Sequence, residues 1–295
     1  MKNYHDIEKM FVDRHYIADR SVWMTLYLSI QLEKPLLIEG PAGVGKTEIA
    51  KVLADSLDTD LIRLQCYEGL DASHAIYEWN YQHQLLHMKM HEKDASASDR
   101  LEQDIFSDKF LMKRPLLQAI QTDKSPVLLI DEVDRSDEEF ESFLLEILSD
   151  WQITIPEVGT IKAKNKPFVI LTGNRTRELS EALRRRCLYL WIPYPDFPKE
   201  LAIVKEKVDG IDERLAAQIC QFMMELRQLK LDKAPGVAET LDWAKALVTM
   251  HLDHLDKEIV EDTLGIVLKD WQDIRQTTDS LSELFEKTGI TSKIG

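Results

Sequence analysis

The sequence predicts an α/β fold, a mostly parallel sheet covered by helices, followed by an all-helical domain. Short apolar runs alternate with helical segments through the first two thirds of the 295 residues. Such alternation is typical of parallel strands between two layers of helices. After Pro193 and Pro195 only helical patterns remain. We therefore expect two domains, residues 1–195 as the α/β core and residues 196–295 as a helical domain with a C-terminal tail.

Four apolar runs are the expected strands, and each is too short for a helix. They cover residues 35–39, 61–64, 127–130 and 168–172. One helix is expected before the first run, and another directly after it, where apolar residues recur at core spacing from Ile49. The expected helices of the second domain cover residues 201–208, 215–231 and 240–252, with a short polar helix after about Asp279.

Composition and charge exclude several classes of protein. No apolar run is long enough to span a membrane, and the N-terminus lacks the apolar core of a signal peptide, so we expect a cytoplasmic protein. The formal net charge of −15 disfavours broad, sequence-independent binding to nucleic acid, although a local basic patch stays compatible with it. Cys66, Cys187 and Cys220 lie far apart without metal-ligand spacing, as expected of reduced thiols.

A glycine-rich segment after the first expected strand matches the full pattern G-x-x-x-x-G-K-[ST]. It consists of Gly40, Pro41, Ala42, Gly43, Val44, Gly45, Lys46 and Thr47. Its glycines let backbone N–H groups turn towards phosphates, and the following helix adds the positive end of its dipole. Lys46 is expected to reach the β- and γ-phosphates, and the Thr47 hydroxyl to ligate Mg²⁺. The sequence thus predicts a P-loop protein that binds ATP and Mg²⁺.

Two acids, Asp131 and Glu132, follow the third expected strand. An acid at the carboxyl end of a buried strand lies at the edge of a parallel sheet where ligands bind. Asp131 is expected to hold Mg²⁺, and Glu132 to polarise the attacking water. Alternatively these acids merely cap the next helix, since Ser136 and Asp137 also resemble capping residues. Together with the glycine loop, the pair indicates hydrolysis rather than phosphoryl transfer to a small molecule.

Polar and basic residues follow the fourth expected strand. Asn174 lies at its end, where an amide can orient the water and sense the γ-phosphate, although asparagine is also a common turn residue. Arg184, Arg185 and Arg186 come soon after. An arginine at a helix end that faces a neighbouring subunit can stabilise the transition state in trans. A solvated face or ion pairs with the acidic stretch are the alternative, which we favour for Arg184.

These motifs, in this order and followed by a helical domain, resemble the AAA+ ATPases. Residues 64–79 resemble the extra segment that the MoxR branch carries in its second helix, and residues 153–161 its hairpin before the sensor strand. Residues 179–195 are similar to the family's arginine-finger region and the segment that leads into the lid. The chain looks closest to the CoxD-like MoxR proteins, which assist maturation of molybdenum-containing carbon monoxide dehydrogenases and related hydroxylases.

This resemblance implies a homo-oligomeric ring, usually a hexamer, that binds ATP at its subunit boundaries. It also implies a protein client such as a molybdenum hydroxylase, a co-partner with a von Willebrand A-type domain, and no nucleic-acid partner. The implied roles are Lys46 and Thr47 as Walker A, Asp131 and Glu132 as Walker B, Asn174 as sensor 1, Arg185 or Arg186 as the finger, and Tyr16 and Ile17 as adenine contacts. Many relatives carry a sensor-2 arginine early in a lid helix, but residues 235–243 contain none.

An aromatic cluster and a histidine row lie in the first insertion. If the chain is extended there, Tyr77, Trp79 and Tyr81 lie on one side of it. They belong either to a buried hairpin or helix pair, or to a client-facing surface. His83, His87 and His91 share one face of a helix. Because no cysteine or carboxylate set completes a metal site, the histidines are expected to form a helix surface.

Four functions remain open from sequence alone. The leading hypothesis is a ring-forming ATPase that remodels a partner protein. The others are a DNA-linked AAA+ motor, a P-loop kinase for a small molecule, and a nucleotide-gated scaffold with little turnover.

Overall fold

The computed structural model describes residues 3–91, 105–107 and 109–290. The chain divides into two compact units. We call the first the sheet unit; it comprises Met1–Tyr4, Ser21–Glu39 and Thr47–Leu190. The second, which we call the helical unit, comprises His5–Arg20, Gly40–Lys46 and Trp191–Gly295.

A five-stranded sheet with the order β2-β5-β8-β1-β9 forms the centre of the sheet unit. Its strands are β1 (Leu36–Glu39), β2 (Leu61–Gln65), β5 (Val127–Asp131), β8 (Phe168–Gly173) and β9 (Leu188–Trp191). The pairings β2–β5, β5–β8 and β8–β1 are parallel. The predicted α/β fold with a parallel sheet is therefore confirmed, and all four predicted strands are present. β9 is not among the predicted strands: its residues form a short apolar run, but they fall within residues 179–195, which we interpret by resemblance to the arginine-finger region.

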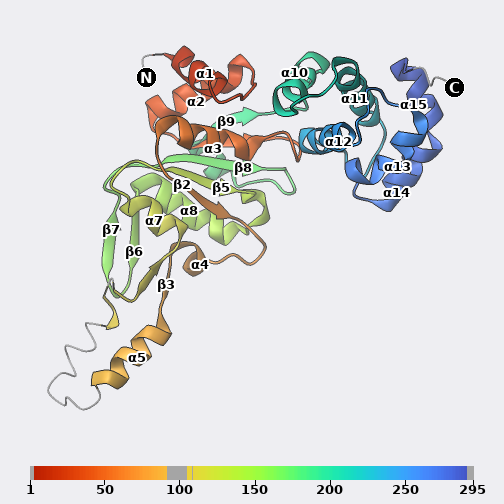
Figure 1. Ribbon diagram of the computed structural model, residues 1–295. Helices are drawn as coiled ribbons and strands as arrows, with labels where there is room; N and C mark the ends of the chain where they lie inside the picture. The colour runs from red at the N-terminus through yellow and green to blue at the C-terminus, as the bar shows by residue number, and fades with distance from the viewer. Residues whose placement is uncertain (1–2, 92–104, 108, 291–295) are drawn as a thin grey trace. The chain divides into compact units, whose positions relative to one another are not determined.

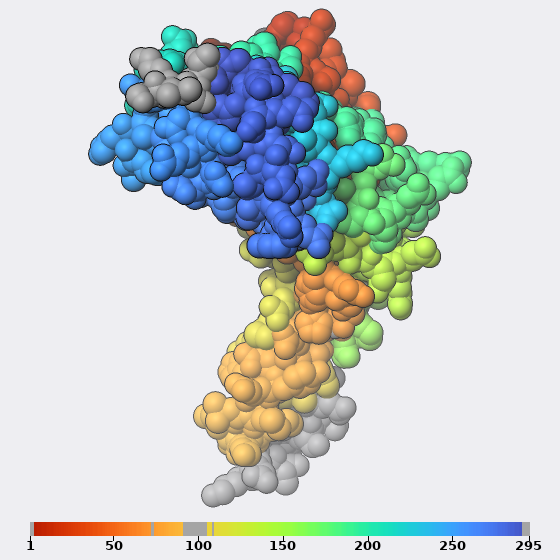
Figure 2. Space-filling view, turned by 90° about the vertical axis from the view of Figure 1, so that its right-hand side faces the viewer, coloured from red at the N-terminus to blue at the C-terminus, as the bar shows by residue number. Residues whose placement is uncertain are grey.

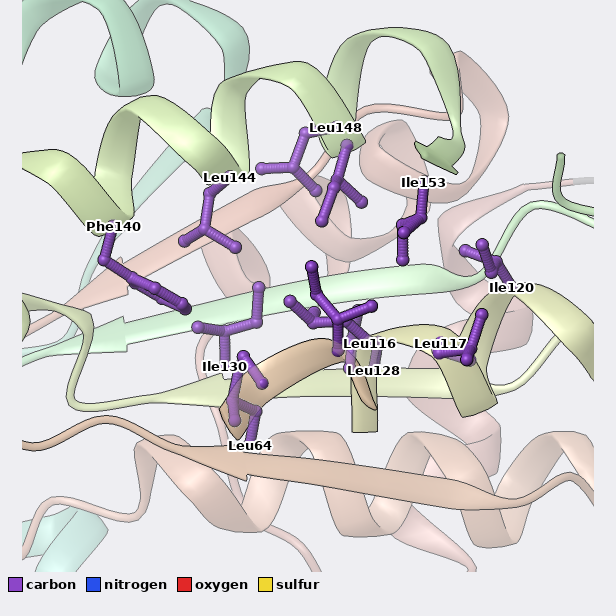
Figure 3. Packing of buried hydrophobic residues seen from close by; sticks show 14 of the residues in the cluster. Leu64, Leu116, Leu117, Ile120, Leu128, Ile130, Phe140, Leu144, Leu148 and Ile153 are labelled. Atoms are coloured by element: carbon purple, nitrogen blue, oxygen red, sulfur yellow. The ribbon is translucent and has the colours of Figure 1, made fainter. Parts of the chain in front are cut away.

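Helices cover both faces of the sheet (Figure 1). α2 (Arg20–Leu32) and α3 (Lys46–Leu57) lie on one side, α7 (Pro115–Gln121) and α8 (Glu138–Asp150) on the other. Figure 3 shows Phe140, Leu144 and Leu148 of α8 pointing towards the apolar side chains of the sheet, among them Ile130. This packing fixes the strands whose carboxyl ends carry the candidate site.

Two hairpins extend the sheet unit. α4 (Ala72–Ile76) leads into β3 (Tyr77–Trp79), which pairs with β4 (Leu111–Lys113), and β6 (Gln152–Ile155) pairs with β7 (Gly159–Lys162). The hairpin interpretation is confirmed for Tyr77 and Trp79, whose rings meet edge to face at 5.9 Å. It is wrong for Tyr81, because the chain turns there into α5 (Tyr81–His91), which leaves this ring 63% exposed.

The histidines of α5 pack against an aromatic ring. The ring centroids of His83 and His87 lie 4.7 and 5.3 Å from that of Phe110. The side chain of His91 lies outside the described residues. Within the described part of the chain, no group of three or more His, Cys, Asp or Glu side chains could hold a metal ion. His83 and His87 thus lie on one helix, as their spacing predicts, beside the ring of Phe110.

The helical unit has its own apolar core. Its main helices are α10 (Phe197–Lys207), α11 (Glu213–Leu226), α12 (Val237–Thr249), α13 (Lys257–Val267), α14 (Trp271–Asp279) and α15 (Leu281–Thr288), and α1 (Tyr4–Val12) precedes them in the chain. Phe222 and Trp243 are fully buried at the centre. We assigned no element to residues 257–279, although Asp256 and Asp270 accept backbone hydrogen bonds as the N-caps of α13 and α14. Throughout the described residues, no helix combines the length and apolar character needed to cross a membrane.

Candidate nucleotide-binding site

The glycine loop follows β1 and runs into α3, as the motif requires. Gly43 and Gly45 adopt φ values of +74° and +88°, a region that side chains disfavour. At Gly40 the limit is space, because a Cβ atom would lie 2.1 Å from the carbonyl oxygen of Ile192. The glycines therefore let the backbone turn tightly and approach other backbone closely, which is the construction of a phosphate cradle.

Lys46 folds back over the loop that precedes it. Its buried Nζ donates hydrogen bonds to the carbonyl oxygens of Gly40 at 2.8 Å and Pro41 at 2.6 Å. Thr47 lies in the first turn of α3, whose N-terminal end attracts negative charge. The loop thus presents an ammonium group, a hydroxyl group and a helix N-terminus within two residues of sequence, a set that suits the phosphates of ATP.

Tyr16 contacts the same loop. Its hydroxyl donates to the carbonyl oxygen of Gly45 at 3.3 Å. Ile17 is partly buried next to it in the chain. The structure thus brings Tyr16, one of the two residues expected near the adenine, onto the phosphate-binding loop.

In the sheet unit, Asp131 is the last residue of β5 and is buried. Thr172 Oγ1 donates to its Oδ1. Arg63 Nε donates to its Oδ2 at 3.1 Å, and Arg63 Nη2 contacts the same oxygen. Asp131 is therefore held by a neutral donor and a cation, which together compensate the charge of a carboxylate at the strand end.

Glu132 follows in the left-handed region, at φ 55° and ψ 48°. Its Oε2 accepts from Gln65 Nε2 at 2.9 Å and from Arg135 Nη1 at 3.1 Å. A non-glycine residue in this region is strained, and such strain concentrates at functional sites. Its backbone N–H donates to Thr172 Oγ1 at 3.0 Å, so one threonine orients both acids.

A third acid, Asp134, orders the turn after β8. Its Oδ2 accepts from the backbone N–H groups of Asn174 at 3.0 Å and Thr176 at 2.7 Å, and from the Thr176 hydroxyl at 2.8 Å. Asp134 is only 2% exposed. The carboxyl ends of the neighbouring strands β5 and β8 thus bring Asp131, Glu132 and Asn174 to one edge of the sheet.

Glu39, the last residue of β1, adds another buried carboxylate. It accepts from the Tyr189 hydroxyl at 2.9 Å, and its Oε2 lies 3.9 Å from Arg175 Nε. The sequence analysis missed Glu39, Asp134, Arg63, Gln65 and Thr172. For Glu39 a signal was present, since a charged residue ends an otherwise apolar strand directly before the glycine loop.

Negative charge at this edge acts on a neighbouring thiol. The pKa of Cys66 is raised to about 12, chiefly by burial and in addition by the carboxylates of Asp131, Asp134 and Glu132. Carboxylate and hydroxyl oxygens are the ligands that Mg²⁺ prefers. The residues present at the edge therefore fit a magnesium ion, with Asp131 as its anionic ligand.

The arginines lie on α9 (Glu181–Arg186), which Ser180 caps. Arg184 lies over the ring of Tyr189 at 5.7 Å, and Arg185 pairs with Glu181 one turn earlier. Arg186 Nε donates to Ser149 Oγ at 2.8 Å, and its Nη1 donates to the carbonyl oxygen of Ala182 at 3.3 Å. All three are exposed.

Comparison with known proteins assigns the described fold to a family. The profile of the AAA domain (dynein-related subfamily) matches residues 35–187. An uncharacterised protein of Staphylococcus aureus is 26% identical over 264 residues, which cover 85% of this chain and 92% of that protein. One of Staphylococcus haemolyticus is 24% identical over 267 residues, covering 86% and 94%.

Two solved structures share the fold. A point mutant of RuvB from Thermotoga maritima matches with a TM-score of 0.52 and 19% identity, over 94% of this chain and 83% of that one. A candidate ATPase from Cytophaga hutchinsonii matches with a TM-score of 0.50 and 17% identity, over 98% and 96%. At these identities the likeness is one of fold.

Proposed function

Because the chain belongs to the AAA domain family, in its dynein-related subfamily, we propose that it is an Mg²⁺-dependent ATPase that uses hydrolysis to remodel a partner protein. The observation that carries this proposal is the pairing of two motifs around one sheet. The complete phosphate-binding loop follows β1, and β5 of the same sheet ends in Asp131 and Glu132. AAA proteins join these two elements into one ATP site.

We assign one role to each residue of this site. The loop from Gly40 to Thr47 binds the phosphates, Lys46 neutralises the γ-phosphate, and Asp131 with Thr47 holds Mg²⁺, whose charge stabilises the transferred phosphoryl group. Glu132 accepts the proton of the attacking water. Asn174 orients that water, and Tyr16 with Ile17 contacts the adenine.

At the scale of the assembly we propose a homo-oligomeric ring, with six subunits as the expected number, that works in the cytoplasm. Residues 1–195 serve as the ATPase core and residues 196–295 as its lid. Arg185 or Arg186 completes the site of a neighbouring subunit. This proposal is supported by the exposure of all three α9 arginines and by the MoxR-like order of the motifs.

For the client, we propose a molybdenum hydroxylase of the carbon monoxide dehydrogenase type, with a von Willebrand A-type protein as co-partner. Support comes from the CoxD-like resemblance and from α5, whose atoms are seen in orange at the surface in Figure 2 and which carries exposed apolar side chains. These are Tyr81, Leu85, Leu86 and Met90. Exposed apolar side chains grouped on one element are typical of protein-binding surfaces.

The proposal is tested by phosphate release and nucleotide binding. We expect Lys46→Ala to abolish ATP binding, and Glu132→Gln to bind ATP without hydrolysing it. Lys51→Ala is the matched control, because Lys51 lies on the same helix, is exposed and pairs with the partly buried Glu48 at 3.1 Å. Glu132→Gln that turned over ATP like the parent would refute the assignment of the base.

The same assay separates the alternative functions. Transfer of the phosphoryl group to a small acceptor would indicate a kinase. Turnover that rises when DNA is added would indicate a DNA-linked motor. Binding of ATP by the parent without turnover would indicate a scaffold. In a second experiment, the Glu132→Gln variant is used in the presence of ATP for an affinity pull-down of the client. Retention of a molybdenum hydroxylase that depends on ATP is the result expected.

A further inference from the structure

The start of α12 packs directly on the phosphate-binding loop within the helical unit. The backbone N–H of Ala238 donates to the carbonyl oxygen of Gly43 at 3.2 Å. A Cβ atom on Gly236 would lie 2.6 Å from the carbonyl oxygen of Ala42 and 2.7 Å from Cα of Gly43. Backbone therefore meets backbone here, without room for a methyl group on Gly236.

Gly236 is required by space and not by conformation. Its φ of −88° and ψ of −171° are extended values that any residue adopts. The obstacle to a side chain is the loop itself, whose carbonyl oxygen and Cα atom belong to main chain that cannot rotate away. A substitution of Gly236 must therefore move either the loop or the start of α12.

The turn that carries Gly236 is held from behind by Arg227. Arg227 Nε donates to the carbonyl oxygen of Pro235 at 2.8 Å, and its Nη2 to that of Gly236 at 3.3 Å. The Glu239 carboxylate accepts from the Gly236 N–H at 2.8 Å and closes the first turn of α12. The carbonyl oxygens of Pro235 and Gly236 and the N–H of Gly236 thus each have a partner.

Arg227 is fixed in turn by a buried ion pair. Its two terminal nitrogens bond both carboxylate oxygens of Glu200 at 2.6 and 2.7 Å, and the Thr240 hydroxyl donates to the same carboxylate at 2.7 Å. The side chains of Arg227 and Glu200 are 6% and 0% exposed. Such two-pronged pairing sets geometry as well as charge. Arg227 also stacks on Tyr194, at 4.9 Å from the ring centre.

We propose that Arg227 is a positioning residue for nucleotide binding. Arg227, which Glu200 holds in place, positions the Pro235–Gly236 turn in contact with Gly43. The conformation of the phosphate-binding loop therefore depends on the packing of the helical unit. Residues 235–243 contain no arginine, and in this arrangement α12 acts on the loop through backbone contact instead. The inference rests on the proposed function of the loop as an ATP site.

The decisive variant is Gly236→Ala, because it leaves the Arg227–Glu200 pair intact. We expect its Kd for Mg-ATP to rise at least about tenfold, measured by calorimetry on the full chain. Gly265→Ala is the matched control, since a Cβ atom there meets no atom of the described residues within 4 Å. It should change the Kd less than about twofold. Gly236→Ala with the parent's Kd, or an equal loss in Gly265→Ala, would overturn the proposal.

Arg227→Lys supplies the second test. Lysine keeps the charge opposite Glu200 but cannot bond a carboxylate and two carbonyl groups with one planar fork. We expect KM for ATP to rise while kcat at saturating ATP stays near that of the parent, because the hydrolytic residues are untouched. A fall in kcat with unchanged KM would contradict a positioning role.

A third test measures amide hydrogen exchange on the parent protein, so no substitution can impair folding. ATP should slow exchange at residues 236–239 together with the loop. Slowing in the loop alone would overturn the inference and leave the proposed function standing. A parent protein that binds no ATP would instead refute the proposed function, and with it the premise of this inference.

Discussion

At the scale of single residues, the two acids that end β5 are held in different ways. Asp131 is buried against Thr172 and Arg63, whereas Glu132 reaches Gln65 and Arg135 near the surface. In the proposed site Asp131 would hold Mg²⁺ with the carboxylate that Arg63 now pairs with, so the two cations would compete. Gln65 and Arg135 both bond Oε2 of Glu132, and a carboxylate has a second oxygen that can meet water. Only the Arg63 side chain of β2 therefore opposes the proposed arrangement.

Arg63→Met should therefore strengthen magnesium binding. Methionine keeps an apolar stem of similar length but removes the cation that competes for Asp131. We expect the Mg²⁺ concentration for half-maximal ATPase activity to fall about two- to fivefold, as suits an ion pair with one exposed partner. Lys51→Met, which removes an exposed lysine of α3, is the control. An unchanged or higher magnesium requirement would show that Arg63 supports the site.

The three cysteines should be inert in the folded protein. Burial raises the pKa of Cys66, Cys187 and Cys220 to about 12 each. At pH 8 almost no thiolate forms, so a disulfide reagent should react with none of the thiols before denaturant is added. Because folding raises these pKa values above 9.0, their contribution to stability is complete below pH 9 and is lost as pH rises towards 12. Rapid titration of a native thiol would contradict this burial.

Local spacing explains which of these residues could be predicted. Lys46, Thr47, Asp131 and Glu132 are recognisable because each lies within a short motif beside its own strand. Gln65 could not be found in this way, because it pairs with Asp131 through the register of β2 on β5. Such a partner depends on strand order, which hydrophobic runs do not specify.

At the scale of elements, a buried polar network joins the strand ends to α9. Arg177 Nε donates to the carbonyl oxygen of Ser136 at 2.8 Å, and the guanidinium group forms an ion pair with Glu141 of α8. The other oxygen of Glu141 accepts from the backbone N–H of Ser180, the cap of α9, at 2.8 Å. One carboxylate therefore fixes where the arginine-bearing helix begins.

Glu141→Gln should loosen α9 and destabilise the sheet unit. The amide cannot serve Arg177 and Ser180 as a carboxylate does, and Glu141 is only 1% exposed. We expect a loss of about 1–3 kcal/mol in the free energy of unfolding, the cost of an unsatisfied buried group, measured by urea denaturation. Glu181→Gln, which breaks the exposed pair with Arg185, should cost less than about 1 kcal/mol. Equal effects of the two variants would contradict the network.

Helices and strands could be predicted where their residues are uniformly buried, and were missed where exposed and buried residues are mixed. β1 and β5 are buried at every position and stand out as apolar runs. β9 is apolar in sequence but only partly buried at a sheet edge, and the buried residues of α14, Asp273 and Thr277, are polar, with Ile274 only partly buried beside them. Asp273 accepts from the backbone N–H groups of Asp232 and Lys233, a contact made across 40 residues that no local pattern reveals.

At the scale of the whole molecule, the proposed ring requires that one subunit completes the site of the next. Arg185 is paired within its own helix, and Arg186 reaches Ser149 of α8. An isologous interface pairs the same surface of two subunits, whereas a heterologous one repeats the same donor and acceptor around a ring. The arginine that acts across this boundary can therefore be identified by measuring ATPase activity in rings that contain two different variants.

Arg186→Ala should impair hydrolysis much more than ATP binding, and its defect should be repaired in trans. Alone, Arg186→Ala lacks the finger and Glu132→Gln lacks the base. In a ring mixed in equal amounts, roughly one site in four receives its base from Arg186→Ala and its finger from Glu132→Gln, so phosphate release should recover to a fraction of the parent's rate. Arg185→Ala mixed in the same way is the comparison. Recovery with Arg185→Ala and none with Arg186→Ala would transfer the role to Arg185, and no recovery in either mixture would show that neither arginine acts across a subunit boundary.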